Sequence, residues 1–158
     1  MILLVAFNVN LDTKDVSIAK KIAEEIRHSG VIVKKDDGTS YRTQGICEGV
    51  KALGWYIKDF DVVQVSMNIV DIKKSPIHIV FDTCVQLATK YGVNVMGSEL
   101  IGCIPKHCLL EAGHYYFNKE NKDCSQYSEL ELMQKSIETL GLESLKPFDI
   151  IKNVLTDF

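Results

Sequence analysis

The chain has 158 residues, of which 46% are hydrophobic and 25% charged, and its formal net charge is −3. These values are ordinary for one globular domain, and the acidic balance argues against a nucleic-acid-binding surface, which is usually basic. No apolar run approaches the ~20 residues that cross a bilayer, so we expect no membrane segment. Five cysteines without a CxxC pair fit neither a disulfide framework nor a zinc site, and with no export signal we expect a cytoplasmic protein.

The first half of the chain predicts three strands and one helix. An apolar run over 2–11 predicts the first strand, and a helix follows it, with Thr13 as N-cap and Ser29-Gly30 at its end. The polar, turn-rich residues 34–45 predict an exposed loop. The strongest hairpin signal consists of strands over 48–58 and 62–71, joined by Asp59-Phe60-Asp61.

The second half begins with a helix whose predicted N-cap is Ser75, with Pro76 at the first helical position and Tyr91-Gly92 at the end. Residues 93–104 predict a fourth strand, interrupted by Gly97 and Gly102. Further helices are predicted from Pro105 to about Phe117, over 127–140 and after Asp149, with a polar loop at 118–126.

This βαββαβ order followed by helices predicts an α+β fold of the ferredoxin-like type. Such a sandwich has a four-stranded antiparallel sheet with two helices on one face. We expect a single domain over residues 1–158, with a core to about residue 117 and a C-terminal helical extension over about 118–158.

One face of the predicted sheet is polar. Asn8 and Asn10 share a face of the first strand, and Gln64, Ser66 and Asn68 share a face of the third. These strands are the central neighbours in this topology, so we expect one contiguous patch. Because a buried unsatisfied amide costs roughly 1–3 kcal/mol, the patch must meet either water or another polar surface. A solvated sheet face and a ligand floor both fit the pattern.

Glu99 is a further candidate, because it lies between Gly97 and Gly102 in a glycine-interrupted strand. Glycines in a strand permit close approach of a backbone or a ligand, and the carboxylate of Glu99 accepts hydrogen bonds from a ring N–H or an amine. The alternative is a bulge with an exposed glutamate. The spacing of histidines and cysteines predicts neither a metal site nor a nucleophile, so we assign no catalytic residue and no metal.

Five motifs together resemble the glutamate formimidoyltransferase family, which includes the first domain of formimidoyltransferase-cyclodeaminase. The likeness spans nearly the whole chain in order. The motifs are Val5-Ala6-Phe7-Asn8-Val9-Asn10-Leu11, Gly54-Trp55-Tyr56, Gln64-Val65-Ser66-Met67-Asn68, the segment Met96 to Pro105, and the segment Leu140 to Asp149.

The resemblance implies a transferase that moves a formimidoyl group from N-formimidoylglutamate to tetrahydrofolate, its co-substrate, in histidine degradation and one-carbon metabolism. Family members pair two ferredoxin-like subdomains with a folate channel between their sheets, and this chain resembles the C-terminal one. One wall of the channel would then carry Asn8, Asn10, Gln64, Ser66, Asn68 and Glu99.

The family's catalytic histidine lies in a His-Pro-Arg sequence of the N-terminal subdomain, and no His-Pro-Arg occurs here. The folate-binding connecting segment would lie just before Ile2, and loop 31–45 differs from that of relatives. We therefore expect this polypeptide alone to be inactive and to need a separate N-terminal half as partner. The alternative is a non-catalytic small-molecule-binding or dimerisation module, a homodimer whose polar face pairs with its own copy.

Overall fold

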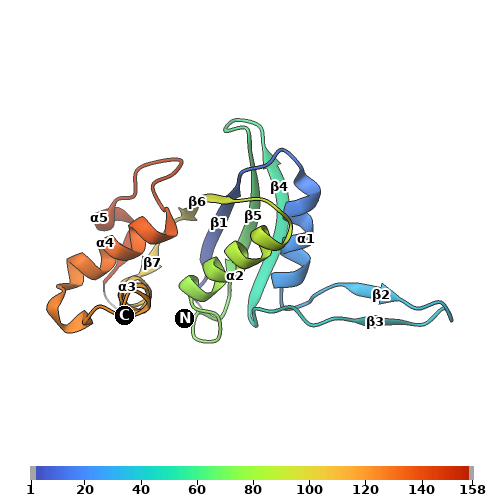
Figure 1. Cartoon of the computed structure of the whole chain (residues 1–158), viewed down its shortest axis with the longest axis horizontal. Helices are drawn as coiled ribbons and strands as arrows, with labels where there is room; N and C mark the ends of the chain where they lie inside the picture. The colour runs from blue at the N-terminus through green and yellow to red at the C-terminus, as the bar shows by residue number, and fades with distance from the viewer. Residues whose placement is uncertain (1–2, 157–158) are drawn as a thin grey trace.

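The computed structural model describes residues 3–156 and shows a central sheet-and-helix body with a two-stranded ribbon on one side and C-terminal helices on the other (Figure 1). The sheet contains β1 (Val5–Leu11), β4 (Val50–Ile57), β5 (Val62–Ile69) and β6 (Val95–Ile101) in the order β4-β5-β1-β6. All neighbouring strands are antiparallel. This order confirms the predicted ferredoxin-like fold, with the first and third predicted strands at the centre.

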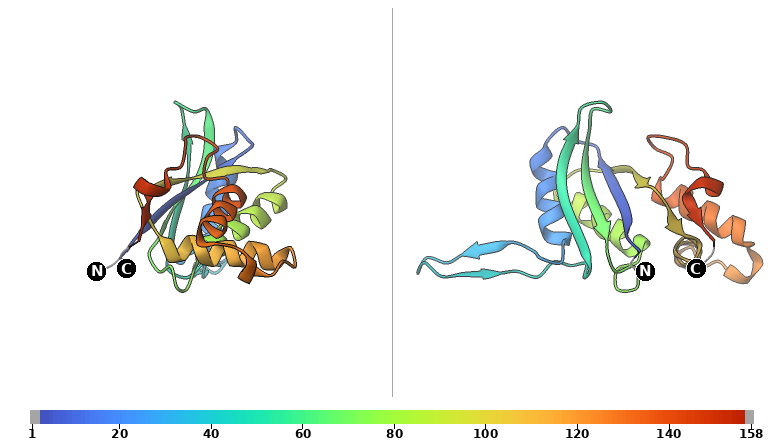
Figure 2. Two further views of the ribbon diagram at one scale, coloured as in Figure 1. Left: turned by 90° about the vertical axis from the view of Figure 1, so that its left-hand side faces the viewer. Right: turned by 180° about the vertical axis from the view of Figure 1, so that it is seen from behind.

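Two helices, α1 (Val16–Ile26) and α2 (Ile77–Lys90), cover one face of the sheet. Strand alternation directs apolar side chains toward them, and Phe7, Val9 and Val65 are fully buried there. Seen from behind, no helix crosses in front of β1 and β5 (Figure 2, right). No helix therefore covers the opposite face of the sheet, which carries the polar side chains predicted from the strand pattern.

The two helices begin differently from the prediction. Asp15, and not Thr13, caps α1, because its carboxylate accepts the Ser17 N–H at 3.0 Å while the Thr13 hydroxyl accepts the Asp15 N–H at 3.1 Å. Ser75 does not cap α2; its hydroxyl donates instead to the Glu48 carbonyl at 2.6 Å, which ties the helix start to the segment before β4.

The prediction of a loop over 34–45 was wrong in part. The segment is exposed, but β2 (Ile32–Lys34) and β3 (Ser40–Arg42) pair as an antiparallel ribbon that extends away from the sheet. The Lys35 N–H donates to the Thr39 carbonyl at 2.7 Å and closes the turn. Strands of only three residues are too short to show an alternation of hydrophobicity, so the sequence pattern contains no clear signal for them.

The C-terminal part packs beside β6. It consists of β7 (Ile104–Pro105), α3 (Lys106–Lys119), the 3₁₀ helix η1 (Cys124–Gln126), α4 (Glu129–Leu140), α5 (Ile150–Asn153) and β8 (Val154–Leu155). The predicted strand 93–104 is divided, since β6 ends at Ile101 and β7 pairs in parallel with β8. The Asn153 side chain donates to the Gly102 carbonyl at 3.0 Å and fastens this return of the chain.

The end of α4 matters for the site. Its start has a capping box between Ser128 and Glu131, and it ends at Gly141 in the left-handed conformation (φ 64°). The turn that follows brings Ser144 next to β6.

No helix within residues 3–156 combines the length and apolar character needed to cross a membrane.

Candidate functional site

The open face of the sheet brings the six predicted side chains onto three adjacent strands. Asn8 lies opposite Ser66 of β5 on one side and opposite Glu99 of β6 on the other. Asn10 lies opposite Gln64, and Asn68 lies opposite Ala6. The six residues thus form one continuous patch. We call this patch, together with the β4 side chains that lie beside it, the open face.

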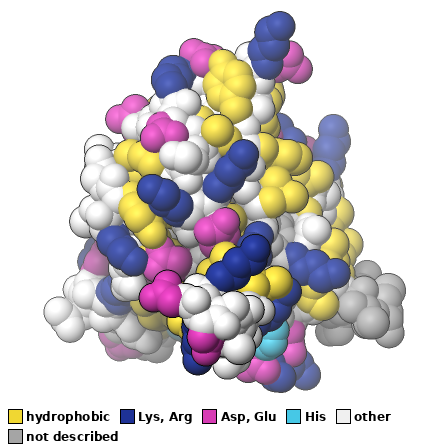
Figure 3. Space-filling view, turned by 90° about the vertical axis from the view of Figure 1, so that its right-hand side faces the viewer, with side chains coloured by type: hydrophobic (Ala, Val, Ile, Leu, Met, Phe, Trp, Pro, Cys, Tyr) yellow, Lys and Arg dark blue, Asp and Glu magenta, His cyan; other side chains and the backbone are white. Residues whose placement is uncertain are grey.

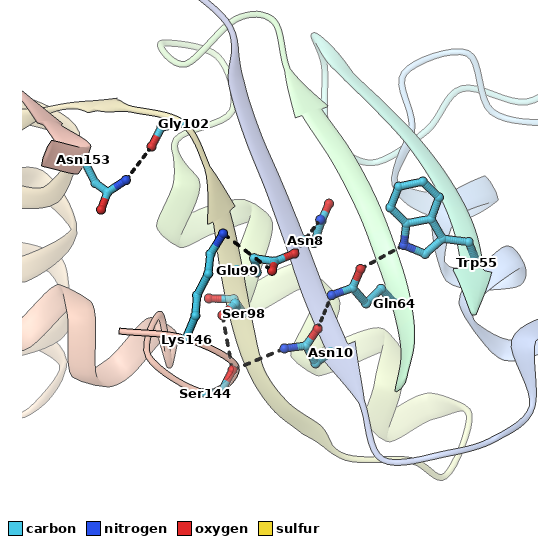
Figure 4. Close-up of polar contacts among 10 residues, drawn as sticks. All are labelled: Asn8, Asn10, Trp55, Gln64, Ser98, Glu99, Gly102, Ser144, Lys146 and Asn153. Carbon is cyan, nitrogen blue, oxygen red and sulfur yellow. Dashed lines mark hydrogen bonds and ion pairs between the residues drawn. The ribbon is translucent and has the colours of Figure 1, made fainter. Parts of the chain in front are cut away.

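A chain of hydrogen bonds crosses the open face from its edge to the turn after α4 (Figure 4). The Trp55 indole N–H donates to Gln64 Oε1 at 2.8 Å, and Gln64 Nε2 donates to Asn10 Oδ1 at 2.6 Å. Asn10 Nδ2 donates to Ser144 Oγ at 3.2 Å, and Ser144 Oγ donates to the Ser98 carbonyl at 3.2 Å. Gln64 is 0% exposed and Asn10 is 1% exposed, so these two amides hold the face together internally.

A second group surrounds Glu99. Asn8 Nδ2 donates to Glu99 Oε1 at 3.1 Å, and the Lys146 ammonium lies 3.9 Å from Glu99 Oε2 (Figure 4). Asn8 and Glu99 are buried, whereas the Lys146 side chain is half exposed. The bond to Glu99 fixes the orientation of the Asn8 amide and leaves its carbonyl oxygen as the acceptor for another group.

Ser66 and Asn68 are the open members of the patch. Ser66 is partly exposed and Asn68 is exposed. Among the residues that the structure describes, neither side chain donates or accepts a hydrogen bond. They present free donors and acceptors beside the amide of Asn8, and they are therefore the groups on this face that are available to a ligand.

Exposed apolar side chains border this polar patch. Leu53 is 50% exposed and Trp55 41% exposed on β4, and Ile101 is 47% exposed at the end of β6. From the side of α1 and the ribbon, hydrophobic side chains reach the surface among lysines and arginines (Figure 3). A polar patch with an apolar border is typical of a surface that takes up a ligand or a partner.

Gly97 allows a close approach between two backbone segments. Its φ is 147°, and a Cβ there would lie 2.5 Å from the Ser144 side chain and 2.9 Å from the Gly141 carbonyl oxygen. The glycine therefore allows the turn after α4 to close onto β6, where the Ser98 N–H donates to the Gly141 carbonyl at 2.9 Å. At Gly97 the close approach is thus that of another backbone segment, while Glu99 is buried and is not the exposed glutamate of the alternative interpretation.

Sequence reasoning did not assign Trp55, Ser144 or Lys146 to the site. Each falls inside a motif of the family resemblance, but periodicity gave them no role. Ser144 and Lys146 lie in a turn without alternation, and Trp55 reads as one more β-former in its strand. Only the fold shows that they meet the amides of β1 and β5.

The remaining candidate chemical groups lie away from the open face. Burial raises the pKa of the Cys108 thiol to about 12, which favours the neutral thiol over the thiolate although His107 lies beside it. His78 is buried against Tyr115, and loss of hydration lowers its pKa. Across residues 3–156, no three His, Cys, Asp or Glu side chains gather closely enough to hold a metal ion.

The sequence profile of the formiminotransferase domain matches residues 6–157. The chain belongs to the formiminotransferase domain family. The match includes every strand of the central sheet except the first residue of β1, as well as the turn carrying Ser144 and Lys146. The open face and its hydrogen-bonded turn are thus both parts of this formiminotransferase domain.

Curated relatives of the domain come from bacteria, archaea and animals. A protein named glutamate formimidoyltransferase from Streptococcus pyogenes serotype M1 is 42% identical over 120 residues, which cover 76% of this chain and 36% of the relative. A protein of the same name from Thermoplasma acidophilum is 35% identical over 120 residues, or 76% of this chain and 35% of the relative. Formimidoyltransferase-cyclodeaminase from Gallus gallus is 32% identical over 147 residues, or 92% of this chain and 25% of the relative. The matched region spans about a quarter to a third of these relatives.

Proposed function

We propose that this chain supplies one folate-binding wall of a glutamate formimidoyltransferase. The reaction would transfer a formimidoyl group from N-formimidoylglutamate to tetrahydrofolate in the degradation of histidine. The observation that carries the proposal is the open sheet face, where Ser66, Asn68 and the carbonyl of Asn8 stand free beside a rigid amide network. The names of the curated relatives support the same reaction.

The free groups of the open face suit the ring edge of a folate. A pyrimidinone ring presents alternating donors and acceptors, and neutral amide and hydroxyl groups match both kinds. Lys51 is exposed opposite Asn68, and Lys146 is half exposed beside Glu99. These two ammonium groups would attract the carboxylates of a folate or of N-formimidoylglutamate.

We expect the group for general acid–base catalysis to lie outside this chain, in another part of the enzyme. Glu99 is the carboxylate among the six open-face residues, and both its oxygens have partners in Asn8 and Lys146. A catalytic half, from a separate chain or from the rest of a longer protein, would pack across the open face. Leu53 and Ile101 would bury their exposed surface against it.

Calorimetric titration with folinic acid tests this proposal. We expect heat of binding from the chain, and Asn68→Ala is expected to weaken binding by roughly 3–10-fold, the value of one hydrogen bond. Asn94→Ala is the matched control, because Asn94 is an exposed asparagine just before β6 and its structural bond to Asp12 uses the backbone carbonyl.

The absence of heat from both the wild type and Asn94→Ala would contradict a folate wall in this chain. The same preparation is expected to show no turnover of N-formimidoylglutamate with tetrahydrofolate, since a missing acid or base typically costs 10²–10⁴-fold in rate. Turnover by the chain alone would place the catalytic group within it and refute that assignment.

A further inference from the structure

Trp55 is an exposed aromatic side chain with a fixed orientation. It is the single tryptophan of the chain and lies on the open face of the edge strand β4, where it is 41% exposed. Its indole N–H donates to Gln64 at 2.8 Å, so the N–H edge of the ring points inward across the sheet (Figure 4). A surface tryptophan without a hydrogen bond is free to change rotamer, whereas the bond to Gln64 holds the Trp55 side chain in one rotamer.

The support behind Trp55 is itself rigid. Gln64 is fully buried, and its Nε2 is bound to Asn10, which is bound in turn to Ser144 of the turn after α4. Four segments of the chain, namely β4, β5, β1 and the turn after α4, therefore fix the position of the indole. A ring that is ordered before binding loses little conformational entropy when a ligand stacks on it.

The surroundings of the indole fit a flat heterocycle with polar edges. Trp55 lies directly opposite Gln64 and diagonally to Ser66, and Asn8 is opposite Ser66 on the next strand. Neighbouring strands are about 4.8 Å apart, so Asn8 lies two strands and about 10 Å from the strand that carries Trp55. A bicyclic ring with hydrogen-bonding groups on its far edge spans such a distance.

We propose that the indole of Trp55 is the stacking platform for the bicyclic ring of a tetrahydropterin, with Ser66 and Asn8 at the polar edge of its pyrimidinone part. This inference rests on the proposed folate-binding function and names the part of the ligand that this wall holds. The p-aminobenzoyl ring is the poorer fit, since it lacks the ring donors and acceptors that Ser66 and Asn8 would meet.

Trp55 fluorescence and calorimetry together test the platform. The signal comes from one residue, so titration with folinic acid or a pterin fragment is expected to change it saturably at the concentrations at which heat is released. N-acetyltryptophanamide corrects for absorption by the ligand. Trp55→Leu is expected to weaken calorimetric binding about 10-fold, the usual effect of removing a stacked aromatic, and Trp55→Phe by less than about 3-fold. The thermal midpoints of both variants show whether they remain folded.

Four results would overturn the inference. Equal affinity of wild type and Trp55→Leu for folinic acid would remove the platform and leave the proposed function standing. A loss confined to p-aminobenzoylglutamate would assign the indole to the other ring. If Trp55→Leu bound folinic acid normally but no longer bound an N-terminal formimidoyltransferase half, the indole would be a contact for that protein and not for folate. Wild-type protein that releases no heat with folinic acid would refute the proposed function and the platform with it.

Discussion

Replacing Asn10 with alanine is expected to lower the free energy of unfolding by about 1–3 kcal/mol, because the substitution leaves the buried amide of Gln64 without its acceptor. Gln64 Nε2 loses its acceptor at 2.6 Å, and Ser144 loses the amide that holds the turn after α4 against the sheet. Gln64 is 0% exposed, so water does not replace the lost bond without a rearrangement. Urea unfolding at neutral pH measures the difference.

Asn68→Ala provides the matched control for Asn10→Ala. It removes the same side chain from the same face, but Asn68 is exposed and has no side-chain hydrogen bond among the described residues, so its effect should stay within about 0.5 kcal/mol. If Asn10→Ala were as mild as Asn68→Ala, the amides would not hold the open face together, and Trp55 would have no rigid support.

Gly54→Val is expected to destabilise the fold by about 3 kcal/mol or more. A Cβ at this position of β4 would lie 2.4 Å from the backbone nitrogen of Lys20 and 2.5 Å from the carbonyl carbon of Ala19. Both atoms belong to the backbone of α1, so no side-chain rotation relieves the contact. The helix would have to move off the sheet and would uncover Ala19 and Ile22, which are fully buried.

Leu53→Val is the comparison for Gly54→Val. Leu53 is the neighbouring residue of β4, is 50% exposed and points to the open face, so valine there should change stability by less than about 0.5 kcal/mol. Chemical unfolding of both variants measures the contrast. A Gly54→Val protein as stable as Leu53→Val would mean that α1 does not contact β4 through its backbone.

The strands, the main helices and the sheet order are predictable from the sequence because they follow simple periodicity. Alternation with period two marked β1 and β5, helical spacing marked α1 and α2, and the known order of a ferredoxin-like sheet placed β1 beside β5. The same alternation placed Asn8, Asn10 and Gln64 on one face. The sequence pattern alone therefore predicts that this face of the sheet is polar.

What each of these side chains does was not predictable, because it depends on contacts between distant segments. Asn10 and Ser144 are 134 positions apart, and no local pattern indicates that the turn after α4 returns to β1. For that reason the sequence did not separate the buried amides of Asn10 and Gln64 from the exposed amide of Asn68. The two-residue pairing of β7 with β8 was missed for the same reason.

Chemical-shift mapping of the ¹⁵N-labelled chain with folinic acid tests most directly whether the open face binds folate. We expect four signals to shift together and saturate at one affinity: the backbone amides of Ser66 and Asn68, the side-chain amide of Asn8 and the indole N–H of Trp55. Shifts confined to α1 and α2, or no shifts at concentrations where the family's co-substrate should bind, would contradict a folate wall on this face.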